Sequence, residues 1–342
     1  MKHTLIKIFL WVPITIVFSM VSCRENVVHR VGRPLLGTIV NLTVVSDTLE
    51  KAAIAAEAAF TEIQRIEALM SPHAKGSDIA RINIGAFQRP ITISPETFAL
   101  IEKSKTIWKE SGGSFDITFA AISHLWDYRR EPFIPPARDT VRAIRHLVDS
   151  GAIILDPVKK TVRFTKPGMK IGLGAIAKGY AVMRALEVLR RNGIRSALVA
   201  AGGDIQVMGD KDGEDWITGL VHPRTKEIVI GIRMKDGDAV STSGDYERYA
   251  MYRGVRYHHI IDPFTGEPAR HFASVSVISR NPVNCDGYDT AIFVMGMERA
   301  RKLLERRNDL GVIVIGLDMK VWISSSLKGR IVPLKEMEIY WL

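Results

Sequence analysis

The chain is poor in cysteine, with only Cys23 and Cys285 among its 342 residues. A framework of several disulfides is therefore excluded, and a hydrophobic core must stabilise the fold. The chain is long enough to bury such a core, as one large domain or as two coupled lobes. Low-complexity stretches, long linkers and internal repeats are also lacking, so nothing divides the chain into separate units.

Long apolar runs are confined to the N-terminus. Residues 1–22 have the features of a secretory signal, because two lysines precede an apolar run that is short for a membrane span. The string Met20-Val21-Ser22-Cys23 resembles a bacterial lipobox, whose cysteine is lipidated after cleavage. We expect the mature chain, residues 23–342, to be exported and lipid-anchored through Cys23 to a bacterial membrane, the inner membrane at its periplasmic face. The alternative is an ordinary signal peptide followed by a chance cysteine.

Acidic residues are fewer than basic ones, and the formal net charge is +10. Much of the excess lies in patches such as Arg129-Arg130 and residues 299–307, which are typical of solvated faces. We expect no nucleic-acid partner, because the chain is exported. The surplus charge favours contact with anionic headgroups or an anionic cofactor.

A P-loop is absent, because no G-x-x-x-x-G-K-[ST] string occurs. The stretch from Gly172 to Tyr180, GLGAIAKGY, instead opens a segment with apolar residues at helical spacing. Small residues at a helix N-terminus let backbone N–H groups approach a ligand, and the helix dipole favours negative charge there. Lys178 adds a positive charge one turn into the helix. The stretch predicts a seat for a phosphate or pyrophosphate, and so a nucleotide ligand.

The same stretch matches the dinucleotide fingerprint G-x-G-x-x-A loosely, through Gly172, Gly174 and Ala177. A Rossmann turn needs a buried strand just before it and an acidic residue about 20 positions on, and neither is present. The remaining alternative is a helix that packs closely against a sheet through its small residues.

Helices and strands alternate irregularly, which favours the α+β class. We expect a single large domain of two coupled lobes, with mixed or antiparallel sheets and flanking helices. The expected helices are 49–69, 95–110, 176–191 and 290–305. The expected strands are 38–44, 196–200, 216–221, 228–234, 239–243, 257–261, 275–278, 312–317 and 320–324, with a hairpin over 155–164.

Acids and hydroxyls gather in the string Asp286-Gly287-Tyr288-Asp289-Thr290, where a helix is expected to begin. Asp286 and Thr290 are four residues apart, so one helical turn places them on the same side. Oxygen ligands of this kind suit Mg²⁺ or Ca²⁺ and not zinc. A backbone carbonyl in the glycine-rich stretch, such as that of Ala175, would complete the site. An Asp N-cap beside a buried Thr is an equally open alternative.

Three further strings combine small residues with polar ones. Ser114-Phe115-Asp116 follows a glycine pair, and on its own favours a turn aspartate that caps the next segment. His258-His259 is expected on one strand, with the two rings on opposite faces, and a His that faces the site is a candidate general base. The alternative is a partly buried structural His. Residues 241–246 end a strand in hydroxyls, which donate to phosphates or form a polar turn.

Eight strings, taken in order, are similar to those of the ApbE family of FAD:protein FMN transferases, which are often exported lipoproteins. They cover nearly the whole mature chain and are Gly37-Thr38, Ser111 to Asp116, Gly174 to Tyr180, Ala201 to Ile205, His222-Pro223-Arg224, Ser241 to Tyr249, His259 to Gly266 and Asp286 to Gly296.

The resemblance implies Mg²⁺-dependent cleavage of the FAD pyrophosphate and transfer of FMN to a Thr or Ser hydroxyl of an acceptor flavoprotein, with release of AMP. The implied metal ligands are Asp286, Thr290, the Ala175 carbonyl and Asp289. The residues implied at the FAD site are Ser114, Phe115, Asp116, Lys178 and Ile260. His259 is the candidate base for the acceptor hydroxyl, and Lys178 is a second candidate catalytic residue.

The chain departs from the family at three positions that contact FAD in relatives. Leu36 stands where Met usually precedes Gly-Thr, His73 stands where an aromatic residue is common, and Gly172 stands where an acid often occurs. FAD affinity and the adenine pose are therefore left open. So are two other functions: a Mg²⁺-dependent FAD pyrophosphatase giving FMN and AMP, and a non-catalytic FAD-binding lipoprotein.

Overall fold

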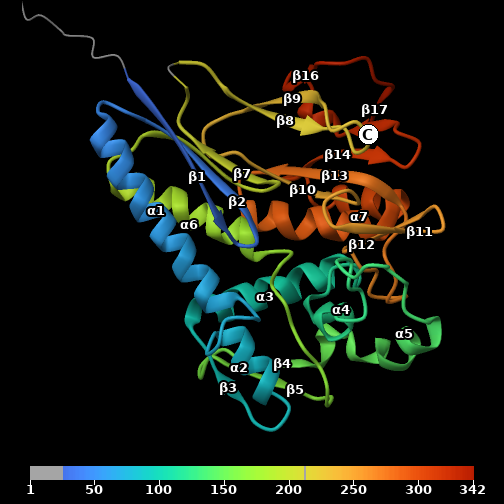
Figure 1. The fold of residues 1–342 in the computed structure, drawn as a ribbon. Helices are drawn as coiled ribbons and strands as arrows, with labels where there is room; N and C mark the ends of the chain where they lie inside the picture. The colour runs from blue at the N-terminus through green and yellow to red at the C-terminus, as the bar shows by residue number, and fades with distance from the viewer. Residues whose placement is uncertain (1–25, 212) are drawn as a thin grey trace, which may run out of the picture.

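The computed structural model describes residues 26–211 and 213–342. The expected signal segment, residues 1–22, and the expected lipidation site Cys23 lie outside the described residues. The described residues form an α+β architecture, with a large sheet and its covering layers above a smaller, mostly helical lobe (Figure 1). The expected fold class is confirmed.

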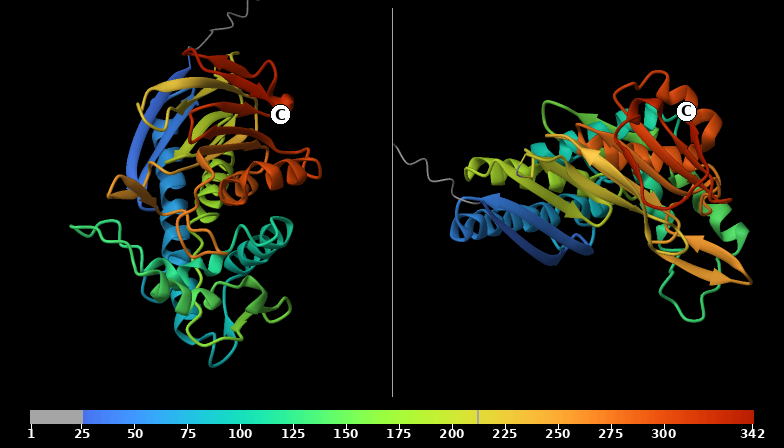
Figure 2. Two further views of the ribbon diagram at one scale, coloured as in Figure 1. Left: turned by 90° about the vertical axis from the view of Figure 1, so that its right-hand side faces the viewer. Right: turned by 90° about the horizontal axis from the view of Figure 1, so that it is seen from above.

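The large sheet runs through the upper lobe, and all its neighbouring strands are antiparallel except the last pair, which is parallel. Its order is β1 (Val27–Leu35), β2 (Thr38–Ser46), β6 (Ser196–Ala201), β7 (Asp204–Met208), β10 (Ala239–Gly244), β13 (Phe272–Ser279), β14 (Gly311–Gly316), β15 (Val321–Ile323) and β17 (Ile339–Trp341). Two views at right angles show how the sheet and the helices below it form successive layers (Figure 2).

Three long helices cover one face of this sheet: α1 (Leu49–Met70), α6 (Ala177–Arg191) and α7 (Pro282–Leu304). A three-stranded sheet covers the other face, in the order β16 (Ile331–Pro333), β9 (Ile228–Met234) and β8 (Trp216–Val221). Successive side chains of β14 point to opposite faces of the sheet. Val312 and Val314 pack in the core beneath the helices, while Ile313 and Ile315 pack toward the small sheet.

The lower lobe is built from short elements between α1 and α6. They are α2 (Asp78–Gly85), β3 (Ile91–Thr92), α3 (Pro95–Glu110), η1 (Ile117–Phe119), α4 (Ala120–Ser123), α5 (Arg138–Ile144), η2 (Arg145–Leu147), η3 (Ser150–Ala152), β4 (Ile153–Asp156) and β5 (Thr161–Phe164). A further 3-10 turn, η4 (Ser325–Leu327), lies near the C-terminus.

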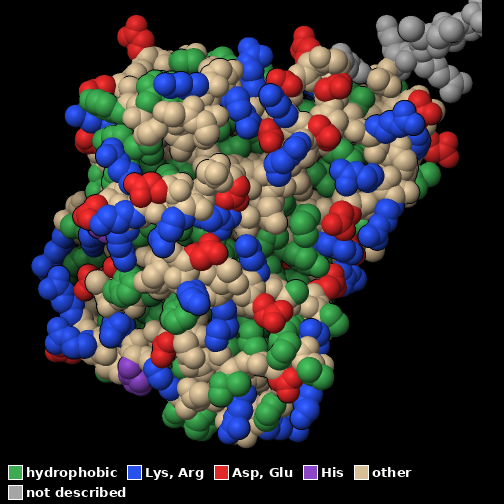
Figure 3. Space-filling view, turned by 180° about the vertical axis from the view of Figure 1, so that it is seen from behind, with side chains coloured by type: hydrophobic (Ala, Val, Ile, Leu, Met, Phe, Trp, Pro, Cys, Tyr) green, Lys and Arg blue, Asp and Glu red, His purple; other side chains and the backbone are tan. Residues whose placement is uncertain are grey.

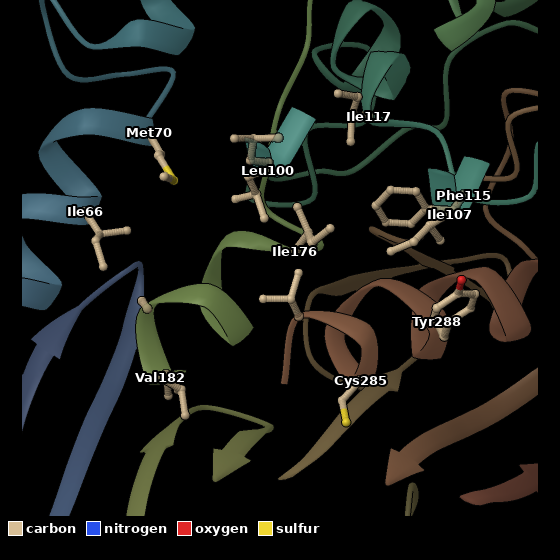
Figure 4. Packing of buried hydrophobic residues seen from close by; sticks show 14 of the residues in the cluster. Ile66, Met70, Leu100, Ile107, Phe115, Ile117, Ile176, Val182, Cys285 and Tyr288 are labelled. Carbon is tan, nitrogen blue, oxygen red and sulfur yellow. The ribbon is translucent and has the colours of Figure 1, made fainter. Parts of the chain in front are cut away.

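One continuous hydrophobic core joins the two lobes. Ile107 of α3 and Phe115 from the lower lobe belong to the same buried cluster as Ile176 and Tyr288 of the upper lobe. Figure 4 shows these side chains converging where α3, α6 and α7 approach one another. The lobes are therefore coupled by packing, as the sequence predicts.

A separate two-stranded sheet, β11 (Tyr249–Tyr252) and β12 (Val255–His258), projects from the upper lobe. One face of this hairpin rests on a smaller cluster that contains Trp126 and Phe133 of the lower lobe. The Tyr128 hydroxyl also donates to the His258 carbonyl oxygen at 2.7 Å. The hairpin thus bridges the lobes at a second place.

Most expected elements are confirmed to within a few residues, and the ends of α3, β8 and β9 are those predicted. Two expectations are wrong. The last long helix begins at Pro282 and not near Thr290, with Asn281 as its N-cap. The strand expected over 257–261 ends at His258, and Ile261 instead forms an isolated bridge with Pro268. Among the described residues, no helix combines the length and apolar composition needed to cross a bilayer.

On the face shown in Figure 3, charged side chains are dispersed and form no continuous patch of one sign. Lys and Arg side chains spread over that whole face, with Asp and Glu between them and hydrophobic side chains in small groups. This distribution agrees with the interpretation of the basic patches as solvated faces.

Candidate functional site

The glycine-rich stretch and the first turns of α7 lie against each other. The Gly179 N–H of α6 donates to Asp286 Oδ2 at 2.9 Å. A Cβ at Gly179 would lie 2.3 Å from the Pro282 carbonyl oxygen, so only glycine permits this approach of the two helices. Gly174, in contrast, has open space where a Cβ would be. The two strings that the sequence singles out therefore meet in one place.

Lys178 lies at the centre of this contact. Its ammonium forms an ion pair with Asp204 and lies 3.3 Å from Asp286 Oδ1. Burial disfavours the charged ammonium, but Asp204 and Asp286 outweigh burial and raise the pKa of Lys178. Its side chain is 30% exposed, so Lys178 lies at the edge of the buried cluster.

Hydroxyl groups of β10 form hydrogen bonds with the acids and with Thr290 of this cluster. Ser241 Oγ lies 2.8 Å from Asp289 Oδ2 and is also within hydrogen-bond distance of Asp204, so its single proton is shared between the two acids. Thr290 Oγ1 donates to Asp289 Oδ1 at 3.2 Å and lies 3.1 Å from Ser243 Oγ. Ser241 thus orients carboxylates here, and the hydroxyls that end β10 belong to the same cluster as α7.

Asp204 is the site residue that sequence reasoning missed as a candidate. It begins β7 directly after Gly202-Gly203 and is buried. A Cβ at Gly203 would lie 2.9 Å from the Thr242 carbonyl oxygen, so the turn approaches β10 closely. The sequence signal that could have identified Asp204 is the glycine pair directly before it, at the start of a strand.

The cluster carries more buried negative charge than its own cation neutralises. Burial and the neighbouring Asp204 carboxylate raise the pKa of Asp286 to about 7, against the opposing effect of Lys178. Burial and the Asp286 carboxylate raise the pKa of Asp289 well above its usual range. Three acids facing one ammonium favour a further cation or proton at this place.

The predicted metal ligands are brought together in part. Asp286, Asp289 and Thr290 lie on consecutive turns of α7, and Ala175 lies in the loop just before α6. Across residues 26–211 and 213–342, no group of three or more His, Cys, Asp or Glu side chains has the arrangement of a metal site. The predicted set relies on a hydroxyl and a backbone carbonyl besides its two carboxylates, and it remains a prediction.

His259 and His258 have different surroundings, as the sequence predicts for neighbouring rings. His258 is buried, and its Nε2 lies 2.7 Å from the Ala269 carbonyl oxygen. His259 Nδ1 is buried without a hydrogen-bond partner among the described residues. Burial, together with the positive charges of Arg248 and Lys178, lowers the pKa of His259 to about 3. His259 is therefore a neutral imidazole at neutral pH, near the positive charges of Arg248 and Lys178.

The turn between β1 and β2 reaches the same region. Leu36 and Gly37 have φ of 56° and 69°, as a tight hairpin turn requires. The Arg248 guanidinium donates to the Gly37 carbonyl oxygen at 3.2 Å, and the Leu36 N–H donates to Glu67 Oε1 at 3.0 Å. His73 is exposed in the loop that follows α1.

The residues implied at the FAD site from the lower lobe are mostly buried. Ser114 Oγ is buried without a partner in the described residues, whereas Phe115 is part of the core. Asp116 accepts from the Thr118 N–H at 2.8 Å and the Ser150 N–H at 2.9 Å, so the capping interpretation of this aspartate is confirmed. Ser114 is the member of this string that retains an unused polar group.

Gly172 begins the glycine-rich stretch, and Ile260 directly follows His259. The Gly172 N–H donates to the Ile117 carbonyl oxygen at 2.9 Å, and a Cβ there would lie 3.3 Å from the Ala120 methyl group. Ile260 is buried, and its N–H donates to His258 Nδ1 at 3.3 Å. Ile260 therefore helps to fix the segment that carries His259.

Comparisons with known proteins agree over most of the chain. A family model described as the ApbE family matches residues 36–314. A relative from Klebsiella pneumoniae, named FAD:protein FMN transferase, is 31% identical over 312 residues, which are 91% of this chain and 96% of the relative. A protein of the same name from Treponema pallidum is 30% identical over 317 residues, 87% of each chain.

Solved structures show the same fold. The crystal structure of the ApbE protein from Thermotoga maritima has a TM-score of 0.82 and 31% identity, and covers 89% of this chain and 99% of that one. The flavin transferase ApbE from Vibrio cholerae has a TM-score of 0.79 and 26% identity, with the same coverage of both chains.

Proposed function

The chain belongs to the ApbE family, and on this premise we propose that it transfers FMN from FAD to a Thr or Ser hydroxyl of an acceptor flavoprotein. The observation that carries the proposal is the junction of α6 and α7, where Lys178 and three buried acids lie beside an exposed glycine loop. This junction combines an ammonium with carboxylates to which we assign a metal ion, as a pyrophosphate substrate would need.

The reaction has one bond formed and one broken at phosphorus. The acceptor hydroxyl oxygen attacks the phosphorus of the FMN half and forms a phosphoester, while the bond from that phosphorus to the bridging oxygen breaks. The hydroxyl proton passes to a base, and AMP leaves with the bridging oxygen. Positioning and charge stabilisation supply most of the catalysis in such transfers.

We assign the base to His259. Its imidazole is neutral at neutral pH, and Nδ1 has no competing partner among the described residues. Bound pyrophosphate would add negative charge near the ring and raise the pKa of His259 toward the range of an effective base. The Arg248 carbonyl oxygen holds the His259 backbone in place at 3.0 Å.

Lys178 contributes a donor with a fixed position. Its ammonium is held by Asp204 and Asp286 while its side chain lies at the edge of the cluster, and we assign to it a contact with the phosphate oxygens. Ser114 Oγ, buried and unpartnered among the described residues, is the polar group that we assign to FAD from the lower lobe.

The donor set also fits Mg²⁺, because Asp204, Asp286 and Asp289 outnumber the single ammonium that they share. We assign the ion to Asp286, Asp289, the Thr290 hydroxyl and the Ala175 carbonyl. When bound, Mg²⁺ would neutralise charge that develops on the phosphate oxygens as AMP departs.

The N-terminal segment supports a proposal about location. The lipobox-like string before Cys23 favours an exported lipoprotein, anchored in the inner membrane and facing the periplasm. The acceptor would then be a membrane-bound or exported flavoprotein. Labelling of cells with a fatty-acid analogue should mark the chain, and Cys23→Ser should abolish the label.

Incubation with FAD, Mg²⁺ and an acceptor flavoprotein domain tests the activity. Mass spectrometry should find an FMN adduct on one Thr or Ser of the acceptor, together with an equal amount of AMP. AMP without the adduct would favour the FAD pyrophosphatase, in which water is the acceptor. Tight FAD binding with no AMP would favour a protein that only holds FAD.

A further inference from the structure

The β11–β12 hairpin has one face against the lower lobe, while its other face is exposed at Tyr249 and Met251 and buried at His258, which pairs with Tyr249. Ala250, Tyr252 and Tyr257 contact the aromatic cluster of the lower lobe. Tyr249 and Met251 alternate with the inward residues and are 40% and 53% exposed. Arg256 pairs with Met251 across the strands, and its guanidinium lies 4.1 Å from the centre of the Tyr249 ring. We call Tyr249, Met251 and Arg256 the hairpin shelf.

The hairpin shelf leads to the candidate site. Arg248 precedes β11 and His259 follows β12, and their backbones are joined by the hydrogen bond of 3.0 Å between the His259 N–H and the Arg248 carbonyl oxygen. The open end of the hairpin therefore lies at the candidate base, and its turn points away (Figure 1). A peptide that follows the hairpin toward its open end arrives at His259.

The surroundings of the shelf are positive. Residues 248–258 contain three arginines and no Asp or Glu, while Asp245 and Glu247 precede them. Asp245 is the acid that Arg256 contacts, at 3.2 Å, but Arg224 already binds both Asp245 oxygens at 2.7 and 2.8 Å. Two guanidinium groups thus share one carboxylate, and the shelf keeps a positive charge.

The backbone of the hairpin is open along β11. In the described part of the chain β11 pairs only with β12, so its outer edge has no neighbouring strand, whereas the Tyr128 hydroxyl already occupies the His258 carbonyl oxygen of β12. An exposed strand edge accepts an extended peptide through main-chain hydrogen bonds, while side-chain contacts provide selectivity. Apolar side chains flanked by arginines favour a peptide that carries both apolar and acidic residues.

We propose that the hairpin shelf binds an extended, acidic and partly apolar segment of the acceptor flavoprotein, next to the hydroxyl that receives FMN. This proposal rests on the proposed function, and it names the chemistry of the acceptor at that same site. Tyr249 and Met251 contact the apolar side chains, and Arg256 contacts the acidic ones. FAD does not contact the shelf.

Substitutions of opposite charge at Met251 test the shelf. Both Met251→Asp and Met251→Lys remove the apolar contact, but only Met251→Asp repels an acidic segment. Met251→Asp should raise the KM for the acceptor domain by about tenfold or more. Met251→Lys should raise it by a much smaller factor, because its charge attracts the segment. The KM for FAD should remain unchanged in both variants.

Ile154→Asp is the matched control, because Ile154 is 51% exposed on β4, in a different sheet. It should leave the KM for the acceptor unchanged. Calorimetric titration of the full chain with an acceptor domain whose target Thr is replaced by Ala should give the same order of affinities without turnover. Equal weakening by both Met251 variants would overturn the acidic partner, and no weakening by either would overturn the shelf. Absence of any adduct with the wild-type chain would instead refute the proposed function itself.

Discussion

The Gly179 N–H donates to Asp286 Oδ2 at 2.9 Å, and this bond joins the start of α6 to the second turn of α7. It places the ammonium of Lys178, the residue before Gly179, within 3.3 Å of the same carboxylate. The Lys178 segment and the acidic segment of α7 are therefore held together by this hydrogen bond and by the Lys178–Asp286 ion pair. Substitution of Gly179 should affect mainly stability, whereas substitution of Asp286 should affect the charge of the site.

Gly179→Ala should destabilise the chain. The added methyl group would meet the Pro282 carbonyl oxygen at 2.3 Å, so α6 and α7 would have to move apart. Such overpacking costs about 1–3 kcal/mol, measured as a loss in the free energy of unfolding by urea. Gly174→Ala is the control, because no atom lies within 4 Å of its added methyl group. Equal stability of the two variants would contradict the close packing described here.

Asp286→Asn should change how stability depends on pH. The pKa of Asp286 is about 7 in the folded chain against an ordinary value of 3.8. Between these values the folded chain binds more protons than the unfolded chain, so the metal-free protein loses stability as the pH rises through this window. Asparagine does not titrate. The free energy of unfolding of Asp286→Asn, relative to that of the wild type, should therefore rise with pH across this window by an amount on the order of a few kcal/mol.

Urea unfolding at pH 5 and pH 8, in the presence of a chelator, measures this difference. Asp139→Asn is the control, because it removes the same charge from a side chain that is 93% exposed. Parallel stability curves for wild type and Asp286→Asn across the window would rule out the raised pKa.

Mg²⁺ should stabilise the wild-type chain in the absence of FAD. Binding to the folded state alone adds about 2.7 kcal/mol when the free ion is at 100 times its Kd. Asp289→Asn should lose most of this gain, because Asp289 is a proposed ligand. Asp139→Asn should retain it. A thermal shift that is the same in both variants would exclude the assigned ligands, whatever the enzyme's activity.

His259→Ala should lower kcat for FMN transfer by about 10²–10⁴-fold, as expected when a general base is removed. FAD binding should persist. Because the pKa of His259 is about 3, the ring stays neutral between pH 5.5 and 8. With Mg²⁺ saturating, kcat/KM of the wild type should therefore show no acidic limb near pH 6.5. A limb at that pH which disappears in His259→Ala would disprove the low pKa.

Sequence patterns predicted the elements whose ends carry local signals. The Ser94-Pro95 start fixed the beginning of α3, and Asn192-Gly193 marked the end of α6. The first turns of α7 gave no such pattern, because residues 282–296 are buried except for Thr290, and a helix buried all round lacks the 3.6-residue alternation. The Pro282 that follows Asn281 was the remaining clue to its start.

Candidate site residues could be proposed from the sequence where one short string contains the reactive groups itself, as do the strings that contain Lys178 and Asp286. Asp204 could not be ranked from the sequence, because its role depends on a pairing of β7 with β10 that brings it to Ser241. The buried state of Phe115 likewise depends on packing between the lobes. Long-range contacts of this kind leave no trace in local spacing.

The shared core limits how FAD can reach its place. Separation of the lobes would expose Ile107, Phe115 and Tyr288, whose exposed fractions are 0%, 1% and 0%. Each such side chain costs about 1.5–3 kcal/mol to hydrate, so the three together approach the whole stability of an ordinary domain. Full separation of the lobes is therefore costly. Motion in this part of the chain is expected to be confined to surface segments, while both lobes stay joined.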